Sequence, residues 1–564
     1  MNYEEKYQKW VSKEDLEPSL KAELLSMDET AKEDAFYTDV EFGTAGMRGI
    51  LGAGTNRLNI YVIQKANVGF AKYIASLPEG KERGVAIGYD NRNMSYQFAI
   101  ESAKVLATYG IKSYIFEALR PTPELSFAVR YLKCAGGIMI TASHNPKEYN
   151  GYKVYDDTGC QLLPEAADQV VQYVNEVEDE LNIHVFSDEE AYPYMTWIGE
   201  EVDAAYYEAV KGIEVNPGMD KSDFKMVFSP QHGTANIPVR TVLKDLGYDV
   251  VPVLAQCAPD PNYTNTKSPN PEVAVAYELA IKKAKEVDAD VVVITDPDGD
   301  RLGVVAKHDG EYVLMSGNQS AAVYLEYILS QMKEKGTLPS NAVMYNTIVT
   351  SDLGELVARH YGVDVEKTLT GFKFIGDKIR KYEATQEKVF VFGYEESYGC
   401  VIKDFVRDKD AVQAVLTAAE AGNYYKKQGK DLIDVLNELY ARHGAFKESQ
   451  IAISKAGAAG SARIKEIMSN LRADAPTEIG GAKVVVVEDY GTSVRYEDGK
   501  ETVIDLPKSN VLKYYLEDGS WIAARPSGTE PKIKFYFSIK GTTVDEATEK
   551  TEVFQKDMMN IVGE

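Results

Sequence analysis

The sequence predicts an α/β protein: three consecutive α/β domains with mostly parallel mixed sheets, followed by a C-terminal α+β domain. Two observations support this prediction. Up to about residue 444, apolar strand-like runs alternate with amphipathic helical segments, as in parallel sheets covered by helices. After that point, short apolar runs separated by turn residues indicate antiparallel strands. At 564 residues the chain is also too long for a single core.

The first domain is expected to comprise residues 1–205. Its opening stretch, residues 1–39, is charged and helix-prone, and predicts a helical arm laid against the domain. The elements expected after it are a strand at 84–90, a helix at 96–109, a strand at 112–116, a helix at 125–134 and a strand at 137–140.

The same pattern recurs twice, without recognisable sequence identity between the repeats. Domain II is expected at 206–315 and domain III at 316–444, with strands at 224–228, 291–295, 342–345 and 388–392. Domain IV is expected at 445–564, with strands at 483–487, 494–496, 521–524 and 533–537 and a helix at 543–562. A separate fourth domain predicts hinge closure about residues 441–447.

Composition restricts the possible partners and the compartment. The formal net charge of −25 argues against nucleic acid or an anionic membrane as a partner, so basic site residues must form a local positive pocket. No apolar run approaches the roughly 20 residues of a membrane helix, and the N-terminus has no apolar signal segment, so we expect a cytoplasmic protein. Four cysteines without a spacing pattern are expected to be free thiols.

The most informative motif is Thr-Ala-Ser-His-Asn-Pro-Lys at residues 141–147, directly after an apolar run. Small residues and a proline predict a tight loop at the end of a buried strand, with the Ser143 hydroxyl beside the His144 imidazole. This arrangement suits a nucleophile. A serine in a polar turn is more often a simple turn or cap residue, and three further loops favour the catalytic interpretation.

The second loop carries Asp296, Asp298 and Asp300 after the run 291–295. Three carboxylates at alternate positions can converge on one hard cation, and Mg²⁺ is the best candidate. A calcium EF-hand needs Gly at the sixth position and Glu at the twelfth, where this chain has Arg301 and Lys307. Zinc is disfavoured because the cluster contains no His or Cys.

Two further loops are suited to binding a phosphosugar. Glu395 and Ser397 follow the run 388–392 and can hydrogen-bond vicinal sugar hydroxyls. Near the C-terminus, the segment from Arg525 to Lys532 combines a guanidinium with hydroxyls and backbone N–H groups that could hold a phosphate. The chain contains no GxxxxGK[ST] or complete GxGxxG motif, so nothing in it indicates ATP or NAD.

Taken in order, these loops resemble those of the α-D-phosphohexomutase family, which includes phosphoglucomutases and phosphomannomutases. The resemblance covers nearly the whole chain, and is greatest to the subgroup of bacterial phosphoglucomutases and animal phosphopentomutase. It is carried by FGTAGMRG, TASHNPKEYNGYKVY, PNPE at 269–272, TLTGFKFIG, GYEESYG and RPSGTEPKIKFY. It implies the family's four-domain, heart-shaped monomer.

The resemblance implies a role for each matching residue. Ser143 matches the phosphoserine that donates the phosphoryl group and contributes an oxygen to the metal, together with Asp296, Asp298 and Asp300. The residues that match the basic groups around the transferring phosphate are Arg48, His144, Lys153 and Arg301. Lys153, with a depressed pKa, is the first candidate for general acid/base, and His144 or another group is the alternative. The residues that match substrate contacts are Thr370, Gly371, Lys373, Glu395, Ser397, Arg525, Ser527, Gly528 and Thr529.

The implied activity is that of a phosphoglucomutase, an isomerase that interconverts glucose 1-phosphate and glucose 6-phosphate. Mg²⁺ would be the cofactor and glucose 1,6-bisphosphate the intermediate and activator. Many bacterial relatives have Gly-Glu-Met-Ser-Gly-His in the sugar loop, whereas Glu396, Tyr398 and Gly399 depart from that pattern here. Phosphomannomutase and phosphopentomutase therefore stay open as alternatives, as does a synthase of sugar bisphosphate that releases the intermediate. A non-catalytic phosphosugar-binding protein is a remote alternative. The expected partner is a small phosphosugar, and the expected state is a monomer or weak homodimer.

Overall fold

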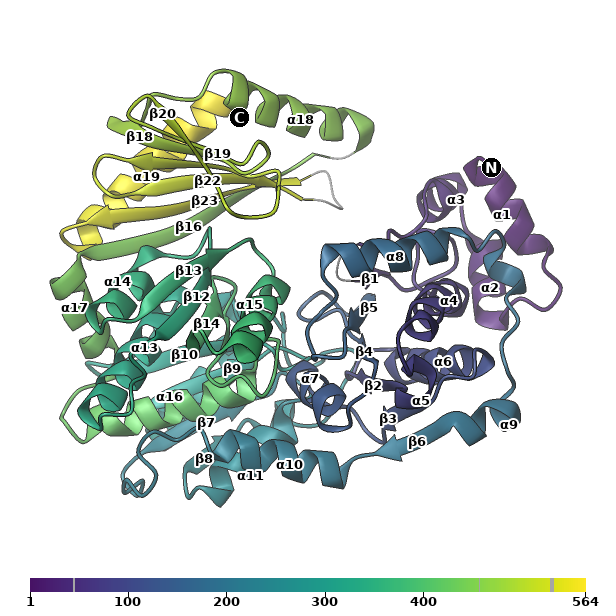
Figure 1. Cartoon of the computed structure of the whole chain (residues 1–564), viewed down its shortest axis with the longest axis horizontal. Helices are drawn as coiled ribbons and strands as arrows, with labels where there is room; N and C mark the ends of the chain where they lie inside the picture. Colours follow the sequence, from purple (N-terminus) through teal and green to yellow (C-terminus); the bar gives the residue numbers. More distant parts are fainter. Residues whose placement is uncertain (44–45, 456, 528–531) are drawn as a thin grey trace. The chain divides into compact units, whose positions relative to one another are not determined.

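The computed structural model describes residues 1–43, 46–455, 457–527 and 532–564. They form two compact units, and Figure 1 colours the chain by residue number. The first unit comprises residues 1–317 and 372–431, and the second comprises 318–371 and 432–564. No helix in the described ranges is long and apolar enough to cross a membrane.

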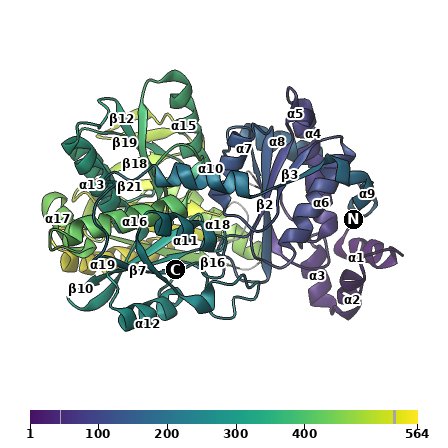
Figure 2. The same cartoon turned by 90° about the horizontal axis from the view of Figure 1, so that it is seen from below.

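A six-stranded mixed sheet, in the order β1-β5-β4-β2-β3-β6, forms the centre of the first domain. β5 is antiparallel to both of its neighbours, whereas β4, β2, β3 and β6 are parallel. β2 and β4 are buried throughout because helices cover both faces: α4, α6 and α8 on one side and α7 and α10 on the other (Figure 2).

The strands of this sheet are β1 (Gly46–Ile50), β2 (Val85–Tyr89), β3 (Ser113–Phe116), β4 (Gly136–Ile140), β5 (Tyr149–Tyr155) and β6 (Met195–Ile198). The helices around it are α4 (Ile60–Ser76), α5 (Gly80–Arg83), α6 (Ser95–Thr108), α7 (Thr122–Tyr131), α8 (Pro164–Asn175), η1 (Glu180–Asn182), α9 (Asp188–Ala191), η2 (Tyr192–Tyr194) and α10 (Glu200–Lys211).

One helix of this domain begins earlier than expected. The sequence predicts it over 125–134, but α7 begins at Thr122 and ends at Tyr131. The prolines in this segment suggest a loop, yet Pro123 lies in the first turn of α7, where a missing N–H costs no hydrogen bond. This earlier start brings Thr122 to the loop that carries Asp296, Asp298 and Asp300.

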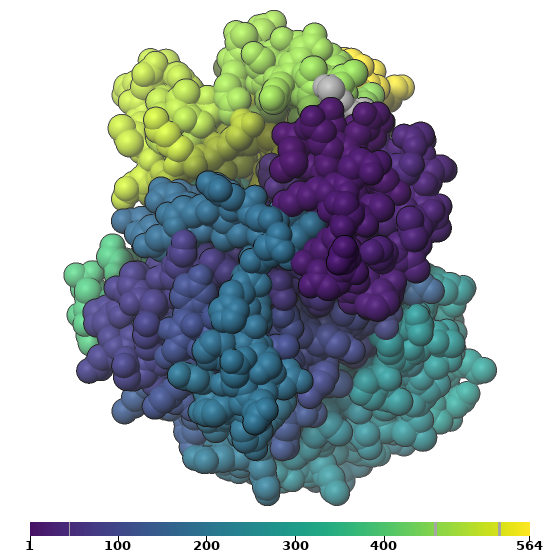
Figure 3. Space-filling model, turned by 90° about the vertical axis from the view of Figure 1, so that its right-hand side faces the viewer, coloured from purple at the N-terminus to yellow at the C-terminus, as the bar shows by residue number. Residues whose placement is uncertain are grey.

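The N-terminal arm consists of α1 (Tyr3–Ser12), α2 (Pro18–Ser26) and α3 (Glu29–Phe36). Trp10 is fully buried, packs edge-on against Tyr61 with ring centroids 5.5 Å apart, and donates from Nε1 to Glu180 Oε1 at 2.9 Å. In Figure 3 the arm is the purple surface beside blue residues of the same unit. Its helices therefore pack on the first domain through an aromatic core of their own.

A second mixed sheet, in the order β11-β10-β9-β7-β8, completes most of the first unit. β7, β8 and β9 are parallel, and β10 is antiparallel to β9. Its elements are β7 (Lys225–Ser229), α11 (Asn236–Asp245), β8 (Asp249–Pro252), η3 (Leu254–Gln256), η4 (Ala274–Tyr277), α12 (Glu278–Val287), β9 (Val291–Thr295), β10 (Leu302–His308) and β11 (Glu311–Met315). The unit also contains α15 (Phe372–Thr385), the antiparallel pair β14 (Val389–Glu395) and β15 (Gly399–Val401), and α16 (Ala411–Lys426).

The second unit contains the parallel pair β12 and β13 and a large antiparallel sheet, in the order β16-β23-β22-β21-β18-β19-β20, with β17 beside β18. Helices α18 and α19 pack their apolar residues on that sheet (Figure 1). The predicted fold class, three α/β domains and a C-terminal α+β domain, is confirmed. The elements are α13 (Gly317–Glu334), β12 (Ala342–Thr347), α14 (Asp352–His360), β13 (Asp364–Thr368), α17 (Leu432–His443), β16 (Ala445–Ser454), α18 (Gly457–Ala473), β17 (Glu478–Ile479), β18 (Ala482–Asp489), β19 (Val494–Glu497), β20 (Lys500–Val503), β21 (Leu512–Leu516), β22 (Trp521–Pro526), β23 (Lys532–Gly541) and α19 (Val544–Val562).

Candidate active site

The serine loop joins β4 to β5 at the carboxyl end of a parallel strand, where ligands of open α/β sheets usually bind. Ser143 has a φ of +52° and is 2% exposed. Its N–H donates to Thr141 Oγ1 at 2.8 Å, and its Oγ lies 3.2 Å from His144 Nδ1. The Oγ donates to Asp296 Oδ2 at 2.8 Å, so the structure joins the first two motifs directly.

The metal loop joins β9 to β10 and carries three buried carboxylates, Asp296, Asp298 and Asp300. One oxygen from each lies within 4.8 Å of the others. Within the described part of the chain, Asp298 Oδ1 and Asp300 Oδ1 are buried without a hydrogen-bond partner. Buried carboxylate oxygens are normally satisfied, so this hard oxygen cluster fits a divalent cation.

Segments from several parts of the first unit hold the metal loop in place. The N–H groups of Thr122 and Thr234 donate to Asp298 O and Pro297 O, both at 2.8 Å. On the other side, the N–H of Ala411 donates to Gly299 O at 3.2 Å. Because these donors come from α7, the loop after β7 and α16, the carboxylates depend on the tertiary fold for their position.

The pKa values of Asp296 and Asp298 are shifted in opposite directions. Burial, with the charges of Asp298 and Asp300, raises the pKa of Asp296 well above its usual range. Burial also opposes ionisation of Asp298, but Lys153 at 2.8 Å and the Thr122 hydroxyl at 2.9 Å lower its pKa overall. A cation in the cluster would favour the ionised form of Asp296.

The pKa of Lys153 is raised in this structure, whereas the sequence-based expectation was a depressed pKa. Burial alone would lower its pKa, but Asp298, Asp300 and Asp408 face the ammonium and raise it. The expectation rested on an arginine and a Mg²⁺ ion beside the ammonium, whereas the charged groups that raise its pKa here are carboxylates of the protein. Lys153 is thus held as a cation in this structure.

The other expected basic residues also lie around the serine and metal loops. Arg48 Nη1 donates to Asn145 Oδ1 at 2.8 Å, and Arg301 Nη1 donates to Glu272 Oε1 at 2.6 Å. Burial and the charges of Arg301 and Arg48 lower the pKa of His144 well below its usual range. His144 is therefore a neutral imidazole next to the serine.

Sequence reasoning missed Lys409, which is 8% exposed. Its Nζ lies 3.1 Å from both Asp300 Oδ2 and Asp408 Oδ1, and these carboxylates raise its pKa although burial lowers it. It also missed Thr122, the hydroxyl donor to Asp298. The run of charged residues at 408–410 before an apolar helix was the signal available for Lys409; Thr122 had no local signal.

The sugar loop lies between β14 and β15, where Glu395 is paired with Gly399. Glu395 ends β14 and is 5% exposed, and Ser397 lies half-buried in the turn. Tyr398, with a φ of +67°, accepts a 2.8 Å hydrogen bond from the N–H of Leu302, just after the metal loop. The sugar and metal loops are thus connected through backbone.

The remaining substrate candidates are divided between the two units. Lys373, in the first turn of α15, has its pKa lowered to about 8 by burial. Thr370 and Gly371 belong to the second unit and precede that helix. Arg525 is the last residue but one of β22, where it pairs with Lys534, and the Ser527 N–H donates to Lys532 O at 2.7 Å. Gly528 and Thr529 lie outside the described residues.

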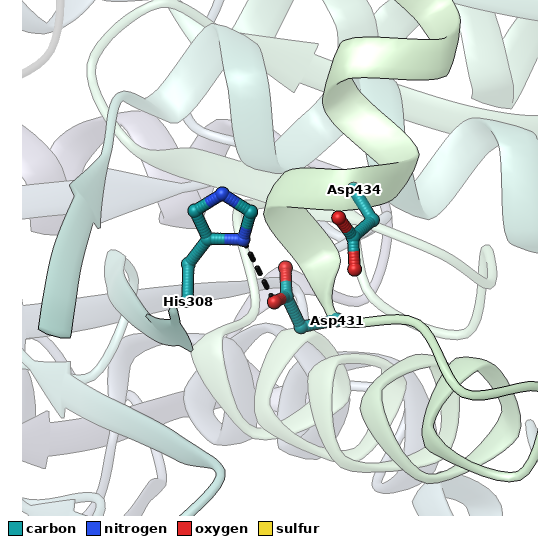
Figure 4. Close-up of side chains that lie close together, drawn as sticks. All are labelled: His308, Asp431 and Asp434. Carbon is teal, nitrogen blue, oxygen red and sulfur yellow. Dashed lines mark hydrogen bonds and ion pairs between the residues drawn. The ribbon is translucent and has the colours of Figure 1, made fainter. Parts of the chain in front are cut away.

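Away from these loops, His308 at the end of β10 lies 2.8 Å from Asp431, between His308 Nδ1 and Asp431 Oδ2 (Figure 4). The His308 ring is also 3.7 Å from Asp309. Both side chains are partly exposed, and acidic groups with such exposure are common without a metal ion. We assign no ion to it.

Sequence models of the phosphoglucomutase/phosphomannomutase family match this chain in four consecutive parts. They are α/β/α domain I at residues 39–181, domain II at 204–310, domain III at 316–443 and the C-terminal domain at 468–555. The chain belongs to this family. Its resemblance to the phosphohexomutases, inferred from the ordered motifs, is therefore confirmed.

Curated members of the family resemble the chain over almost its whole length. A phosphoglucomutase from Staphylococcus haemolyticus is 39% identical over 515 residues, which are 90% of this chain and 92% of that protein. One from Staphylococcus aureus is 39% identical over 521 residues, 92% of each.

Among solved structures, parafusin, a phosphoglucomutase from Paramecium, has a TM-score of 0.67 at 18% identity, covering 93% of this chain and 96% of its own. A family protein from Burkholderia thailandensis gives 0.67 at 19% identity, covering 92% and 97%. The solved structures support the fold of the family.

Proposed function

We propose that this chain is a phosphoglucomutase, a phosphosugar mutase that interconverts glucose 1-phosphate and glucose 6-phosphate. The observation that carries the proposal is the 2.8 Å hydrogen bond from Ser143 Oγ to Asp296, which places a hydroxyl nucleophile at a carboxylate cluster. The 39% identity to curated phosphoglucomutases over about nine-tenths of the chain supports the same activity.

In the proposed reaction, phosphorylated Ser143 is the phosphoryl donor. The bond between its phosphorus and Oγ breaks as the free hydroxyl of the substrate bonds to that phosphorus, which produces glucose 1,6-bisphosphate. The bisphosphate turns around and returns its other phosphate to Ser143. Such transfers depend on in-line positioning and on positive charge around the phosphate. The basic residues of the site would therefore contribute most to stabilising the transferring group.

We assign roles to those residues from their charge. Lys153, Arg48 and Arg301 would bind the equatorial oxygens of the transferring phosphate as cations. His144, held neutral, is suited to accept the proton of the attacking hydroxyl and return it to Ser143 Oγ. Lys153 is the alternative acid once its carboxylate partners are neutralised.

We propose that Asp296, Asp298 and Asp300, with a phosphate oxygen on Ser143, hold Mg²⁺. The two buried oxygens of Asp298 and Asp300 that have no hydrogen-bond partner in the described ranges support this site. When bound, the ion would neutralise charge on the phosphate as it transfers.

For substrate binding, we propose that Glu395 and Ser397 contact sugar hydroxyls. The distal phosphate would contact the clamp residues Arg525, Ser527, Gly528 and Thr529, and the sugar would also face Thr370, Gly371 and Lys373. We further propose domain boundaries at 1–205, 206–315, 316–444 and 445–564, supported by the ranges of the four family models.

Turnover on three substrates tests the activity. We expect kcat/KM to be highest on glucose 1-phosphate, lower on mannose 1-phosphate and lowest on ribose 1-phosphate, with glucose 1,6-bisphosphate shortening any lag. Turnover fastest on mannose or ribose phosphate would reassign the enzyme to phosphomannomutase or phosphopentomutase. Absence of turnover on all three, with Mg²⁺ and bisphosphate present, would refute a mutase.

A further inference from the structure

The serine loop is built around one buried side chain from another part of the domain. Arg92, in the turn after β2, donates from Nη2 to Ser143 O at 2.5 Å and to Asn145 O at 2.6 Å. Its Nη1 donates to Pro146 O at 2.8 Å and to Tyr149 O at 3.0 Å. All four N–H groups at the end of the guanidinium are therefore used by carbonyls of the loop.

The charge of this guanidinium is balanced inside the protein. Arg92 Nε lies 3.2 Å from Asp90 Oδ2, and both side chains are fully buried. Asp90 Oδ1 also accepts from the Arg92 N–H at 3.0 Å and from Ser95 Oγ at 2.7 Å, and the ring of Tyr263 lies 5.4 Å from the guanidinium. A buried charge is tolerated when it is paired and hydrogen-bonded in this way, so Arg92 has a single well-defined position.

The loop needs an external support of this kind. Ser143 adopts a left-handed backbone conformation that a non-glycine residue rarely takes without surrounding structure to enforce it. Within the loop, the Ser143 N–H donates to Thr141 Oγ1 at 2.8 Å, and the backbone hydrogen bonds are Asn145 N–H to Ala142 O at 3.1 Å and Tyr149 N–H to Pro146 O at 3.0 Å. Arg92 supplies the donors that the inward-facing carbonyls require.

We propose that Arg92 is a positioning residue for phosphoryl transfer, which fixes Ser143 Oγ against Asp296 by holding the backbone of the serine loop. This inference rests on the proposed function, because it requires Ser143 to carry the phosphate. A lysine could not replace Arg92, since an ammonium donates from one point and cannot reach four carbonyls spread along the loop. Arg92 itself does not touch the transferring group in this account.

The first test compares Arg92→Lys with wild type and with a matched control. Arg83 also donates to backbone carbonyls of the same domain, from Nε to Lys133 O at 3.1 Å and from Nη2 to Cys134 O at 2.9 Å, but at the other end of β4. We expect Arg92→Lys to lower kcat by about 10²-fold with KM for glucose 1-phosphate nearly unchanged, because misplacement by about 1 Å costs that much. Arg83→Lys should leave both constants at wild-type values.

The second test uses chemical rescue of Arg92→Ala. Guanidinium chloride, at concentrations far below those that unfold proteins, should raise kcat of this variant at least about tenfold by occupying the vacated position. Urea at the same concentration is the uncharged control and should not. Rescue of thermal stability without rescue of kcat would show a merely structural role and overturn the proposal.

Hydrogen exchange provides a readout that does not depend on activity. The backbone amides of residues 142–145 and 147–149 should exchange faster in Arg92→Lys than in wild type, while the rest of β4 and β5 stays protected. If Arg92→Ala does not fold, Arg92→Lys still decides the matter. An Arg92→Lys enzyme with wild-type kcat and unchanged exchange in this loop would refute the positioning role. Absence of turnover in wild type would instead refute the mutase function, and faster exchange in the variant would then still support Arg92 as the support of the loop.

Discussion

Ser143 and Asp296 are 153 positions apart in the sequence, yet Ser143 Oγ donates to Asp296 Oδ2 at 2.8 Å. The contact is possible because each residue follows a parallel strand, and the two strand ends meet within the first unit. The pair connects the nucleophile to the carboxylates without an intervening residue. This geometry is the basis of the first two predictions.

Replacing Ser143 by alanine should abolish phosphoryl storage and turnover. We expect kcat to fall by more than about 10³-fold, because Ser143 Oγ is the hydroxyl held against Asp296 and would carry the transferred phosphate. Intact-mass measurement of the purified wild type should show a fraction heavier by one phosphate, and Ser143→Ala should lack that fraction. The control is Ser187→Ala at the exposed start of α9, which should keep activity. Near-wild-type turnover in Ser143→Ala would exclude the proposed mechanism.

Asp298→Asn should reduce both metal affinity and rate. The change keeps the size of the side chain but removes a charge that faces Lys153, and kcat should fall by about 10²–10³-fold. Calorimetric titration with Mg²⁺ should show weaker binding than in wild type. Asp288→Asn, at an exposed aspartate paired with Lys307, is the matched control and should behave as wild type.

Chelation tests the same site in the unmodified protein. Removal of divalent ions should silence turnover, and added Mg²⁺ should restore it, because carboxylate and phosphate oxygens favour hard cations. Full activity after exhaustive chelation would contradict the metal assignment. Restoration by Zn²⁺ in place of Mg²⁺ would contradict the choice of ion.

Lys513 should make stability depend on pH. This lysine in β21 is fully buried, and it donates from Nζ to Ile348 O at 2.7 Å. Burial, with repulsion from Lys367, lowers its pKa to about 7. Between pH 7 and the unfolded value near 10.4, the unfolded chain binds more protons, so this group makes stability rise with pH across that window.

Lys513→Met removes that dependence. We expect its gain in Tm over wild type to be largest below pH 7 and to shrink as the pH approaches 10, as measured by thermal unfolding across that range. Lys508→Met, at an exposed position near the start of the same strand, is the control and should show a flat difference. A gain that grows with pH would mean that the folded surroundings stabilise the ammonium despite its burial, contrary to this prediction.

Arg525→Ala and Glu395→Gln should separate phosphate binding from sugar recognition. Arg525→Ala should raise KM for glucose and mannose phosphates alike, because both carry the phosphate it is proposed to hold. Glu395→Gln should change the ratio of kcat/KM between the two sugars by roughly 10- to 150-fold, since a hydrogen bond to a charged group contributes about 1.5–3 kcal/mol. Steady-state kinetics of both variants on both sugars decides the matter, and the opposite pattern would mean that the two loops have other roles.

Local sequence was sufficient to find the residues whose chemistry is concentrated in short motifs. Ser143 lies in a small-residue turn after a buried strand, and Asp296, Asp298 and Asp300 alternate in one loop. These patterns also indicated the fold class, because strand and helix periodicities are local properties of the chain. The start of α7 was missed, since Pro123 reads as a loop residue unless it falls in the first turn of a helix.

Tertiary structure decided the pKa values of the site residues and the hydrogen bonds that hold their loops in position. The pKa of Lys153 is raised because Asp298, Asp300 and Asp408 come to it from other segments, which its own motif cannot indicate. Lys409 and Arg92 likewise act across long separations, and Arg92, a single charged residue in a polar turn, carries no local signal of its contacts. Charge interactions and backbone support depend on distances in space, so the sequence determined which groups are present and the fold decided what each one faces.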